Sequence, residues 1–156
     1  MGFLDMIRNK PNFYNNRGIE EFNIGNYENA LEFFNKALKI CSECGEIWYN
    51  RASTLWELGK YYEAIKCYDK ALDINPKQLE VWFNLGVILS GMGKHQEALE
   101  CFNRALELEG EDAEAWFIKG MILKKLKRHP EASECFKKVI MLDPDFKSIK
   151  RRENSI

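Results

Sequence analysis

Three tryptophans recur at an interval of 34 residues, and this interval constrains the fold more than any other feature of the chain. They are Trp48, Trp82 and Trp116. The same register carries a column of alanines, a column of aromatic residues and a column of small residues: Ala30, Ala64, Ala98, Ala132; Phe34, Tyr68, Phe102, Phe136; Gly18, Ala52, Gly86, Gly120. A fixed period of this length predicts stacked copies of one supersecondary unit.

Each unit has the pattern of two helices. The first half of residues 79–112 follows the i, i+3, i+4, i+7 spacing of one helical face, at Trp82, Leu85, Gly86 and Leu89. The second half carries another stripe, at Ala98, Phe102 and Ala105. Gly25, Gly59 and Gly93 stand between the halves and suit a left-handed turn that ends a helix. We expect Gly86 to let the paired helices approach closely, because a larger side chain would hold their backbones apart.

The pattern resembles the tetratricopeptide repeat over residues 11–146, and most closely at Trp82-x2-Leu85-Gly86 with Ala98-x3-Phe102. The resemblance implies an all-α fold, a right-handed α-solenoid of antiparallel helix pairs whose first helices line a concave groove. The expected organisation is an N-terminal arm at 1–10, repeat units at 11–44, 45–78, 79–112 and 113–146, and a short basic tail or partial capping helix at 147–156.

The end units depart from the family pattern. Unit one has Tyr14, Arg17 and Glu21 where Trp, Leu and Tyr are usual, which predicts a weaker core. Unit four has Lys119 in place of Leu and Lys127 in place of the glycine between the helices. Such end units are expected of a stacked array, because their outer faces lack a neighbour.

In the family, inward-pointing positions of the first helices hold a peptide. Carried over to this chain, these positions are Asn16, Ile19, Tyr49, Asn50, Ser53, Trp56, Phe83, Asn84, Val87, Phe117 and Met121. Because an asparagine both donates and accepts hydrogen bonds, the amides at 16, 50 and 84 could pair with the backbone of an extended peptide. They could instead bridge adjacent helices. Trp56 resembles an interaction hot spot, with burial against a neighbouring helix as the alternative.

The apolar residues of the predicted groove favour a partner with apolar anchors. An acidic column through Glu46, Glu80 and Glu114 favours basic residues in that partner. One subtype of the family clamps the terminal carboxylate of heat-shock chaperones with lysine and arginine. At the matching positions this chain has Asn15, Ile19, Asn50, Glu80 and Asn84, of which only Asn50 fits. We therefore predict no binding of acidic chaperone tails.

Cys41 and Cys44 form a CxxC pair between units one and two. Half of a zinc site needs two more ligands nearby, and the sequence has no second CxxC or histidine pair to supply them. An ordinary repeat turn is the preferred interpretation, and a metal or redox role is the weak alternative. Cys67, Cys101 and Cys135 recur at 34 residues, so we expect them to lie too far apart for a disulfide and to act as small, partly buried hydrophobes.

The remaining features argue against several functional classes. The 23 Lys and Arg against 24 Asp and Glu leave a net charge of −1, so no overall field selects nucleic acid or anionic membrane. No Ser/His/Asp set or phosphate loop stands out, and neither enzyme activity nor a cofactor or metal is expected. The start of the chain lacks a signal-peptide pattern, and an odd total of five cysteines favours a reduced, cytoplasmic compartment.

The leading hypothesis is a non-enzymatic adaptor that binds a protein or peptide in the groove. The alternative is a structural assembly subunit that self-associates through its ends as a homo-oligomer. Phe146–Ile156 offers a meagre cover for the last unit, and Phe3 and Ile7 belong to a short apolar arm that we expect either to self-associate or to dock on unit one.

Overall fold

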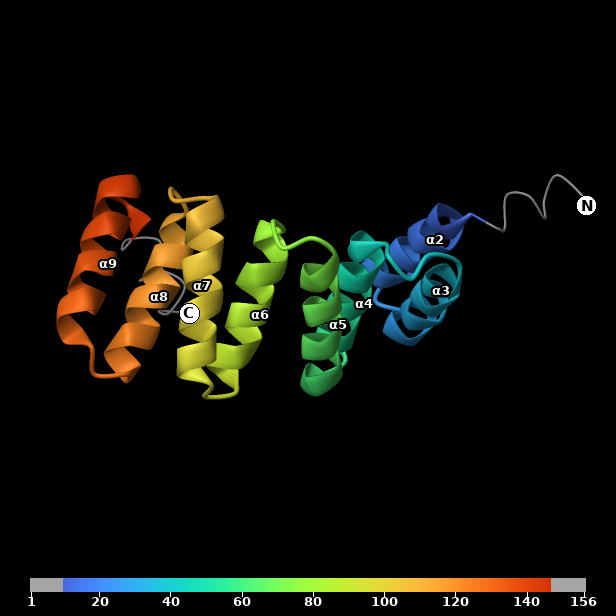
Figure 1. Cartoon of the computed structure of the whole chain (residues 1–156), viewed down its shortest axis with the longest axis horizontal. Coiled ribbons are helices and arrows are strands. Elements are labelled where there is room, and N and C mark those ends of the chain that lie inside the picture. Colours follow the sequence, from blue (N-terminus) through green and yellow to red (C-terminus); the bar gives the residue numbers. More distant parts are fainter. Residues whose placement is uncertain (1–9, 147–156) are drawn as a thin grey trace, which may run out of the picture. The chain divides into compact units, whose positions relative to one another are not determined.

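The computed structural model describes residues 10–146, and within this range the chain forms eight helices (Figure 1). They are α2 (Pro11–Asn23), α3 (Tyr27–Ile40), α4 (Gly45–Glu57), α5 (Tyr61–Ile74), α6 (Leu79–Gly91), α7 (His95–Leu108), α8 (Ala113–Lys125) and α9 (His129–Leu142). The prediction of an all-α fold of antiparallel helix pairs is confirmed. The predicted arm, apart from Lys10, and the predicted tail lie outside the described residues.

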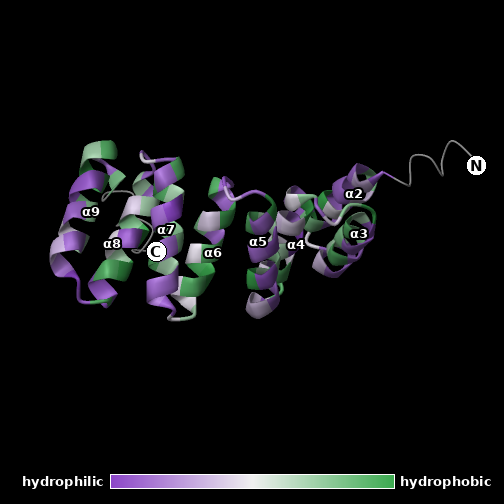
Figure 2. Cartoon of the chain, viewed as in Figure 1, coloured by the Kyte–Doolittle hydropathy of each residue, from purple (hydrophilic) through white to green (hydrophobic). Residues whose placement is uncertain are grey.

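The chain divides into two compact units, residues 1–81 and 82–156. Each is larger than one repeat, and below "the first unit" and "the second unit" mean these two parts of the chain. In the first unit α2 packs on α3, α3 on α4 and α4 on α5; in the second, α7 packs on α8 and α8 on α9. Figure 2 shows hydrophobic and hydrophilic residues on the same helices, as expected of helices that bury one stripe. The predicted alanine column is buried in both units, at Ala30, Ala64, Ala98 and Ala132.

The glycines of the first helices make room for aromatic rings from the second helices. A Cβ atom at any of these positions would stand closer to a ring carbon than real Cβ atoms do. The pairs are Gly18 with Phe34, Gly86 with Phe102 and Gly120 with Phe136, at 2.6, 2.8 and 2.7 Å. The predicted close approach therefore occurs, but the space beside the glycine is filled by a ring of the second helix and not by its backbone.

Left-handed residues separate the helices of each pair. Gly25, Gly59 and Gly93 have φ angles of 83°, 71° and 78°, as the sequence predicts. In the last pair the equivalent residue is Lys127, with φ of 59°. The turn therefore keeps its conformation without glycine, at the steric cost of a side chain in the left-handed region.

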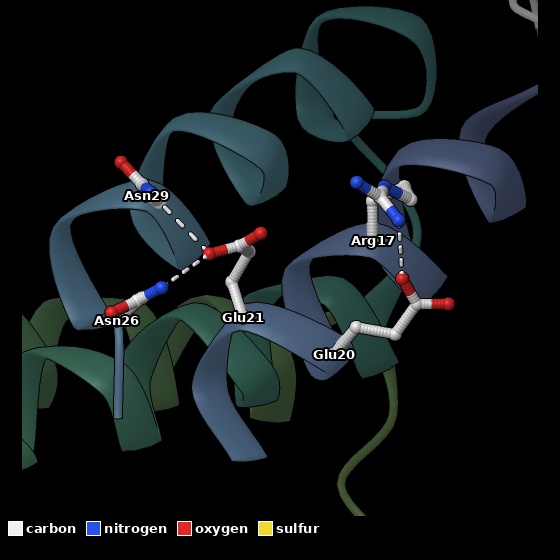
Figure 3. Close-up of polar contacts among 5 residues, drawn as sticks. All are labelled: Arg17, Glu20, Glu21, Asn26 and Asn29. Atoms are coloured by element: carbon white, nitrogen blue, oxygen red, sulfur yellow. Dashed lines mark hydrogen bonds and ion pairs between the residues drawn. The ribbon is translucent and has the colours of Figure 1, made fainter. Parts of the chain in front are cut away.

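Arg17 and Glu21, two departures of unit one from the family pattern, make polar contacts at the surface (Figure 3). The Arg17 Nη1 atom lies 2.7 Å from Glu20 Oε2. The Glu21 Oε2 atom accepts hydrogen bonds from Asn26 Nδ2 at 3.0 Å and from Asn29 Nδ2 at 3.3 Å. These two bonds lower the pKa of the Glu21 carboxyl. A carboxylate thus ties α2 to the turn before α3 and to the first turn of α3.

Replacing Gly86 with alanine is expected to destabilise the fold, because the added methyl group would overlap the Phe102 ring. Overpacking of this kind costs about 1–3 kcal/mol. Gly91, at the end of the same helix, has no neighbouring atom within 4 Å of an added Cβ. Gly91→Ala is therefore the matched control and should leave stability unchanged or slightly raised. Urea unfolding compares the two variants, and equal midpoints would contradict the packing argument.

Glu21 should make the stability of the fold depend on acid pH. Since its folded pKa is depressed, the stabilisation is present above the ordinary glutamate pKa and is lost as the pH falls through the folded value. Glu21→Gln removes this ionisation. The difference in thermal midpoint between the wild type and this variant should be largest near neutral pH and shrink in acid. A difference that stays constant into strong acid would show that the Glu21 charge is not involved.

Candidate functional site

A cleft of about 270 Å³ in the first unit brings together residues from α2, α3 and α4. It is lined by Ile19, Phe22, Asn23, Phe34, Tyr49, Asn50 and Ser53. Four of these were predicted as groove residues: Ile19, Tyr49, Asn50 and Ser53. The buried ring of Phe34 belongs to the hydrophobic core, and Ile19 and Phe22 pack against that core. The cleft therefore has an apolar base, and amide and hydroxyl groups among its walls.

A second cleft of about 220 Å³ adjoins the first at Tyr49. Its other lining residues are Glu46, Gln78, Glu80 and Val81. Glu46 and Glu80 are both exposed, so two members of the predicted acidic column open onto this surface. We call the two clefts together the α2–α4 surface. It combines an apolar hollow with a negatively charged end.

Asn15 links α2 to α4 below this surface. It is only 5% exposed. Its Nδ2 atom donates to Glu46 Oε1 at 3.2 Å, and its Oδ1 atom accepts from Asn50 Nδ2 at 3.0 Å. Asn50 therefore bridges α4 to α2 while it lines the cleft. Of the other predicted amides, Asn16 is exposed and Asn84 is half-buried.

Tyrosine and serine side chains support the wall formed by α4. The Ser53 Oγ atom lies 3.1 Å from the Tyr49 carbonyl oxygen and 3.1 Å from the Tyr68 hydroxyl. The rings of Tyr49 and Tyr68 are 6.0 Å apart. Trp56, another predicted groove residue, is half-buried and does not line either cleft of the α2–α4 surface.

In the second unit two of the predicted groove residues, Phe83 and Phe117, pack against other aromatic rings. Phe83, Asn84, Val87 and Phe117 are half-buried, and Met121 is exposed. The Phe83 ring packs edge-on against Phe102 at 5.5 Å. The Phe117 ring contacts both Phe136, at 6.0 Å, and Phe146, at 5.2 Å. Phe117 is thus flanked by two aromatic residues of its own chain.

Sequence reasoning missed some residues that matter to the site. Nothing in the pattern marks Asn23, whereas the periodicity does place Phe22 in the inward-pointing repeat column of Trp56, although Phe22 was not among the predicted groove residues. The 34-residue register aligns Asn15 with Tyr49, Phe83 and Phe117, which are aromatic, and the helix-bridging role of Asn15 depends on the polar partners that α4 supplies.

A further cleft, of about 560 Å³, lies on α4 and α5. It is lined by Trp48, Arg51, Glu63, Lys66, Cys67, Asp69 and Lys70. The Arg51 guanidinium donates to Cys67 Sγ and to Asn35 Oδ1, and burial raises the pKa of the Cys67 thiol. Basic and acidic side chains of similar number surround the opening. This mixture selects no class of ligand, so the α2–α4 surface is the better candidate site.

Family models of the tetratricopeptide repeat match residues 11–44, 43–109 and 113–146. The chain belongs to the tetratricopeptide repeat family. Members of this family typically act as protein-interaction modules and are generally not catalytic. The resemblance to the tetratricopeptide repeat that the 34-residue register indicates is therefore confirmed.

Solved structures of MamA share the fold of this tetratricopeptide repeat protein. A crystal structure of MamA aligns with a TM-score of 0.83 at 20% identity, over 90% of this chain and 82% of that one. MamA from Desulfovibrio magneticus RS-1 aligns with a TM-score of 0.79 at 23% identity, over 88% of this chain and 77% of that one. At these identities the likeness concerns the fold alone.

One curated relative matches a shorter part of the repeat protein. It is an uncharacterized protein of Methanocaldococcus jannaschii, 39% identical over 46 residues. The match covers 30% of this chain and 54% of the relative, about half of its length.

The cysteines differ from one another in their bonding. Cys67, Cys101 and Cys135 are free and buried, as expected of small hydrophobes. Cys41 and Cys44 are joined by a disulfide, a covalent link that the interpretation as an ordinary repeat turn did not anticipate. Within residues 10–146, no three or more His, Cys, Asp or Glu side chains are grouped so as to hold a metal ion. None of the helices described in that range is long and apolar enough to cross a membrane.

Asn15→Ala should destabilise the first unit by about 1–3 kcal/mol, because it removes the hydrogen bonds that this buried side chain makes to Glu46 and to Asn50. Asn16→Ala, at the exposed neighbouring position, is the matched control and should change stability by less than about 0.5 kcal/mol. Chemical unfolding monitored by circular dichroism measures both. Equal destabilisation by the two variants would contradict a structural role for Asn15.

Proposed function

We propose that this tetratricopeptide repeat protein is a non-enzymatic adaptor that binds an extended segment of another protein on the α2–α4 surface. The observation that carries the proposal is the convergence of Ile19, Tyr49, Asn50 and Ser53 on one cleft with an apolar base. Concave sites with apolar walls and a few placed polar groups are the usual form of binding sites.

The apolar part of the surface takes an aliphatic or aromatic side chain of the partner. Ile19 and Phe22 are partly buried and present their remaining surface to the cleft. Covering such surface releases about 25 cal/mol for each Å² removed from water. The carbonyl and amide groups of Asn23 and Asn50 lie at the same cleft, where they can pair with the partner's backbone.

The acidic part of the surface favours a lysine or arginine near that anchor. Glu46 and Glu80 line the adjoining cleft and are exposed, so their charges act on a ligand through solvent. Opposite charges on the two partners raise the rate of association and fix the register of the bound segment. The same charges disfavour acidic chaperone tails, and neither nucleic acid nor a membrane is the expected partner.

A second candidate function is self-association through the last repeat unit, as a structural assembly subunit. It is favoured by exposed apolar residues at the end of α9, where Met141 is 74% exposed beside Ile140 and Leu142. Sedimentation of the wild type and of Met141→Lys distinguishes this function from the first. Only self-association through α9 predicts an oligomer that this variant converts to a monomer.

The adaptor function is tested by selecting peptides from a display library on the immobilised full chain and measuring their affinity by fluorescence anisotropy. Ile19→Ala should weaken binding about tenfold, since losing most of a buried isoleucine contact costs about 1.5 kcal/mol. Ile24→Ala is the matched control, because Ile24 is 70% exposed at the end of α2 and lines neither cleft. Equal effects of the two substitutions, or a library that yields no binder, would refute the proposal.

Charge reversal tests the preference for basic segments. Glu80→Lys should weaken binding of a selected basic peptide and reduce the salt dependence of its affinity. Glu57→Lys makes the same change in net charge outside both clefts and should have a smaller effect. An acidic chaperone C-terminal peptide should give no binding heat in a calorimeter, and micromolar binding of that peptide would contradict the assignment of the acidic end.

A further inference from the structure

The turns that follow the second helices share one backbone conformation. The residues that end α3, α5, α7 and α9 have φ between −142° and −135° and ψ between 89° and 100°. These residues are Cys41, Asn75, Glu109 and Asp143. The turn at Cys41 therefore has the shape of turns that contain no disulfide.

The other three turns are closed by side-chain oxygens that accept backbone N–H groups. The bonds run from Lys77 N to Asn75 Oδ1 at 3.0 Å, from Asp145 N to Asp143 Oδ1 at 3.1 Å, and from Glu114 N and Ala115 N to Asp112 Oδ1 at 2.8 and 3.0 Å. Such bonds satisfy backbone donors that a turn or a helix start would otherwise leave to solvent.

Cysteines replace these polar groups in the turn between α3 and α4. Cys41 stands at the position of Asn75 and Asp143, and Cys44 stands at the position of Asp112. Cys44 is the N-cap of α4 and makes no side-chain capping hydrogen bond. Instead the two cysteines are joined to each other, with their Cα atoms 5.6 Å apart. The disulfide thus occupies the place of the polar closure in the other turns.

This disulfide lies where a thiol in solution can reach it. Ser42 and Glu43 between the cysteines are exposed, and Cys41 and Cys44 are half-buried. The other three cysteines, Cys67, Cys101 and Cys135, are buried, and burial raises the thiol pKa of Cys67 and Cys135. Since the thiolate is the reactive form, Cys67 and Cys135 are expected to be inert by comparison, and Cys101 is kept from solution by its burial.

The turn has other bonds that do not depend on the disulfide. The Trp48 indole donates to the Ser42 carbonyl oxygen at 2.7 Å. Trp116 makes the equivalent bond to the Gly110 carbonyl at 2.8 Å, in a turn without cysteines. Reduction should therefore leave the turn formed and the two thiols close together, which favours renewed bonding between them over reaction with separate molecules.

We propose that Cys41 and Cys44 form a reversible thiol–disulfide exchange site whose oxidised form closes the turn at the start of α4. The co-reactant is a low-molecular-weight disulfide or its thiol, for which glutathione is the probe. This site is independent of the binding function proposed above.

Oxidation of the two cysteines proceeds by two successive thiol–disulfide exchanges. The Cys44 thiolate, at the N-terminal end of α4 where the helix dipole favours negative charge, attacks one sulfur of the external disulfide and displaces a thiolate. The Cys41 thiolate then attacks Cys44 Sγ and displaces the second thiolate. Two electrons pass to the external disulfide, and the two protons released by the cysteines are taken up by the departing thiolates.

Equilibration of the full chain in glutathione buffers, followed by acid quenching, alkylation and peptide mapping, tests the exchange. The fraction of chains with the Cys41–Cys44 disulfide should depend on the squared concentration of reduced glutathione divided by the concentration of oxidised glutathione. It should reach the same value whether the chain starts reduced or oxidised. Thiols that persist at the most oxidising ratio, or a disulfide that persists at the most reducing one, would overturn the proposal.

Single variants test which sulfur attacks. In Cys41→Ser no second thiol is present in the turn to displace glutathione from Cys44. The mixed disulfide of Cys44 with glutathione should therefore accumulate, and it should form faster than the mixed disulfide of Cys41 in Cys44→Ser. Equal or reversed rates would overturn the assignment of Cys44 as the attacking sulfur. Circular dichroism of each variant confirms that the comparison is made between folded chains.

A third variant tests the closure of the turn. Reduction of the wild type should lower its melting temperature by an amount on the order of 5 °C, as expected for a short disulfide loop in a chain of this size. Cys41→Asn with Cys44→Asp restores the polar groups found in the other turns. Its melting temperature should exceed that of the reduced wild type and should not respond to reductant. Equal melting temperatures of the oxidised and reduced wild type would overturn the stabilising role of the bond.

Discussion

The contact between a glycine of the first helix and an aromatic ring of the second helix, present in three of the four described helix pairs, determines much else in this structure. Phe34 on Gly18 makes the closest of these contacts, and a single added methyl group would overlap the ring. The ring sets the distance between the two helices. The residue after the glycine is turned by about 100° around the helix, so Ile19, which follows Gly18, lies on the neighbouring face. Close packing on one face therefore positions a residue that is proposed to bind a partner.

In the first unit, polar contacts at the surface accompany the apolar core. Arg17 pairs with Glu20, and Glu21 accepts hydrogen bonds from the residues that begin α3. The buried residues of α2 are only Asn15 and Gly18, so the hydrogen bonds of Asn15 to α4 carry more of the attachment of this helix. The weaker apolar core expected at this end is thus accompanied by specific polar links, which also shape the wall of the cleft.

The start of α4 combines the two properties proposed for this protein. Cys44 stands at the N-cap position of the helix, and Glu46 and Tyr49, within its first two turns, line the α2–α4 surface. The disulfide acts on the backbone at the helix start, whereas partner binding uses side chains further along. Because the equivalent turns keep their shape through hydrogen bonds, the chemistry that closes this turn can change without a change of fold.

The 34-residue period by itself determined the helix pairs, the left-handed turns at Gly25, Gly59 and Gly93 and the buried alanine column. These follow from local backbone preferences and from helical spacing, which every unit repeats. The tertiary structure alone decided which of the eleven predicted groove residues share a cleft, and the α2–α4 cleft contains four of them. It also decided that Asn50 bonds to Asn15 and that Cys41 bonds to Cys44. A repeat register treats the residues of one column as equivalent, but their contacts depend on the side chains that neighbouring helices and turns supply, and those differ from unit to unit.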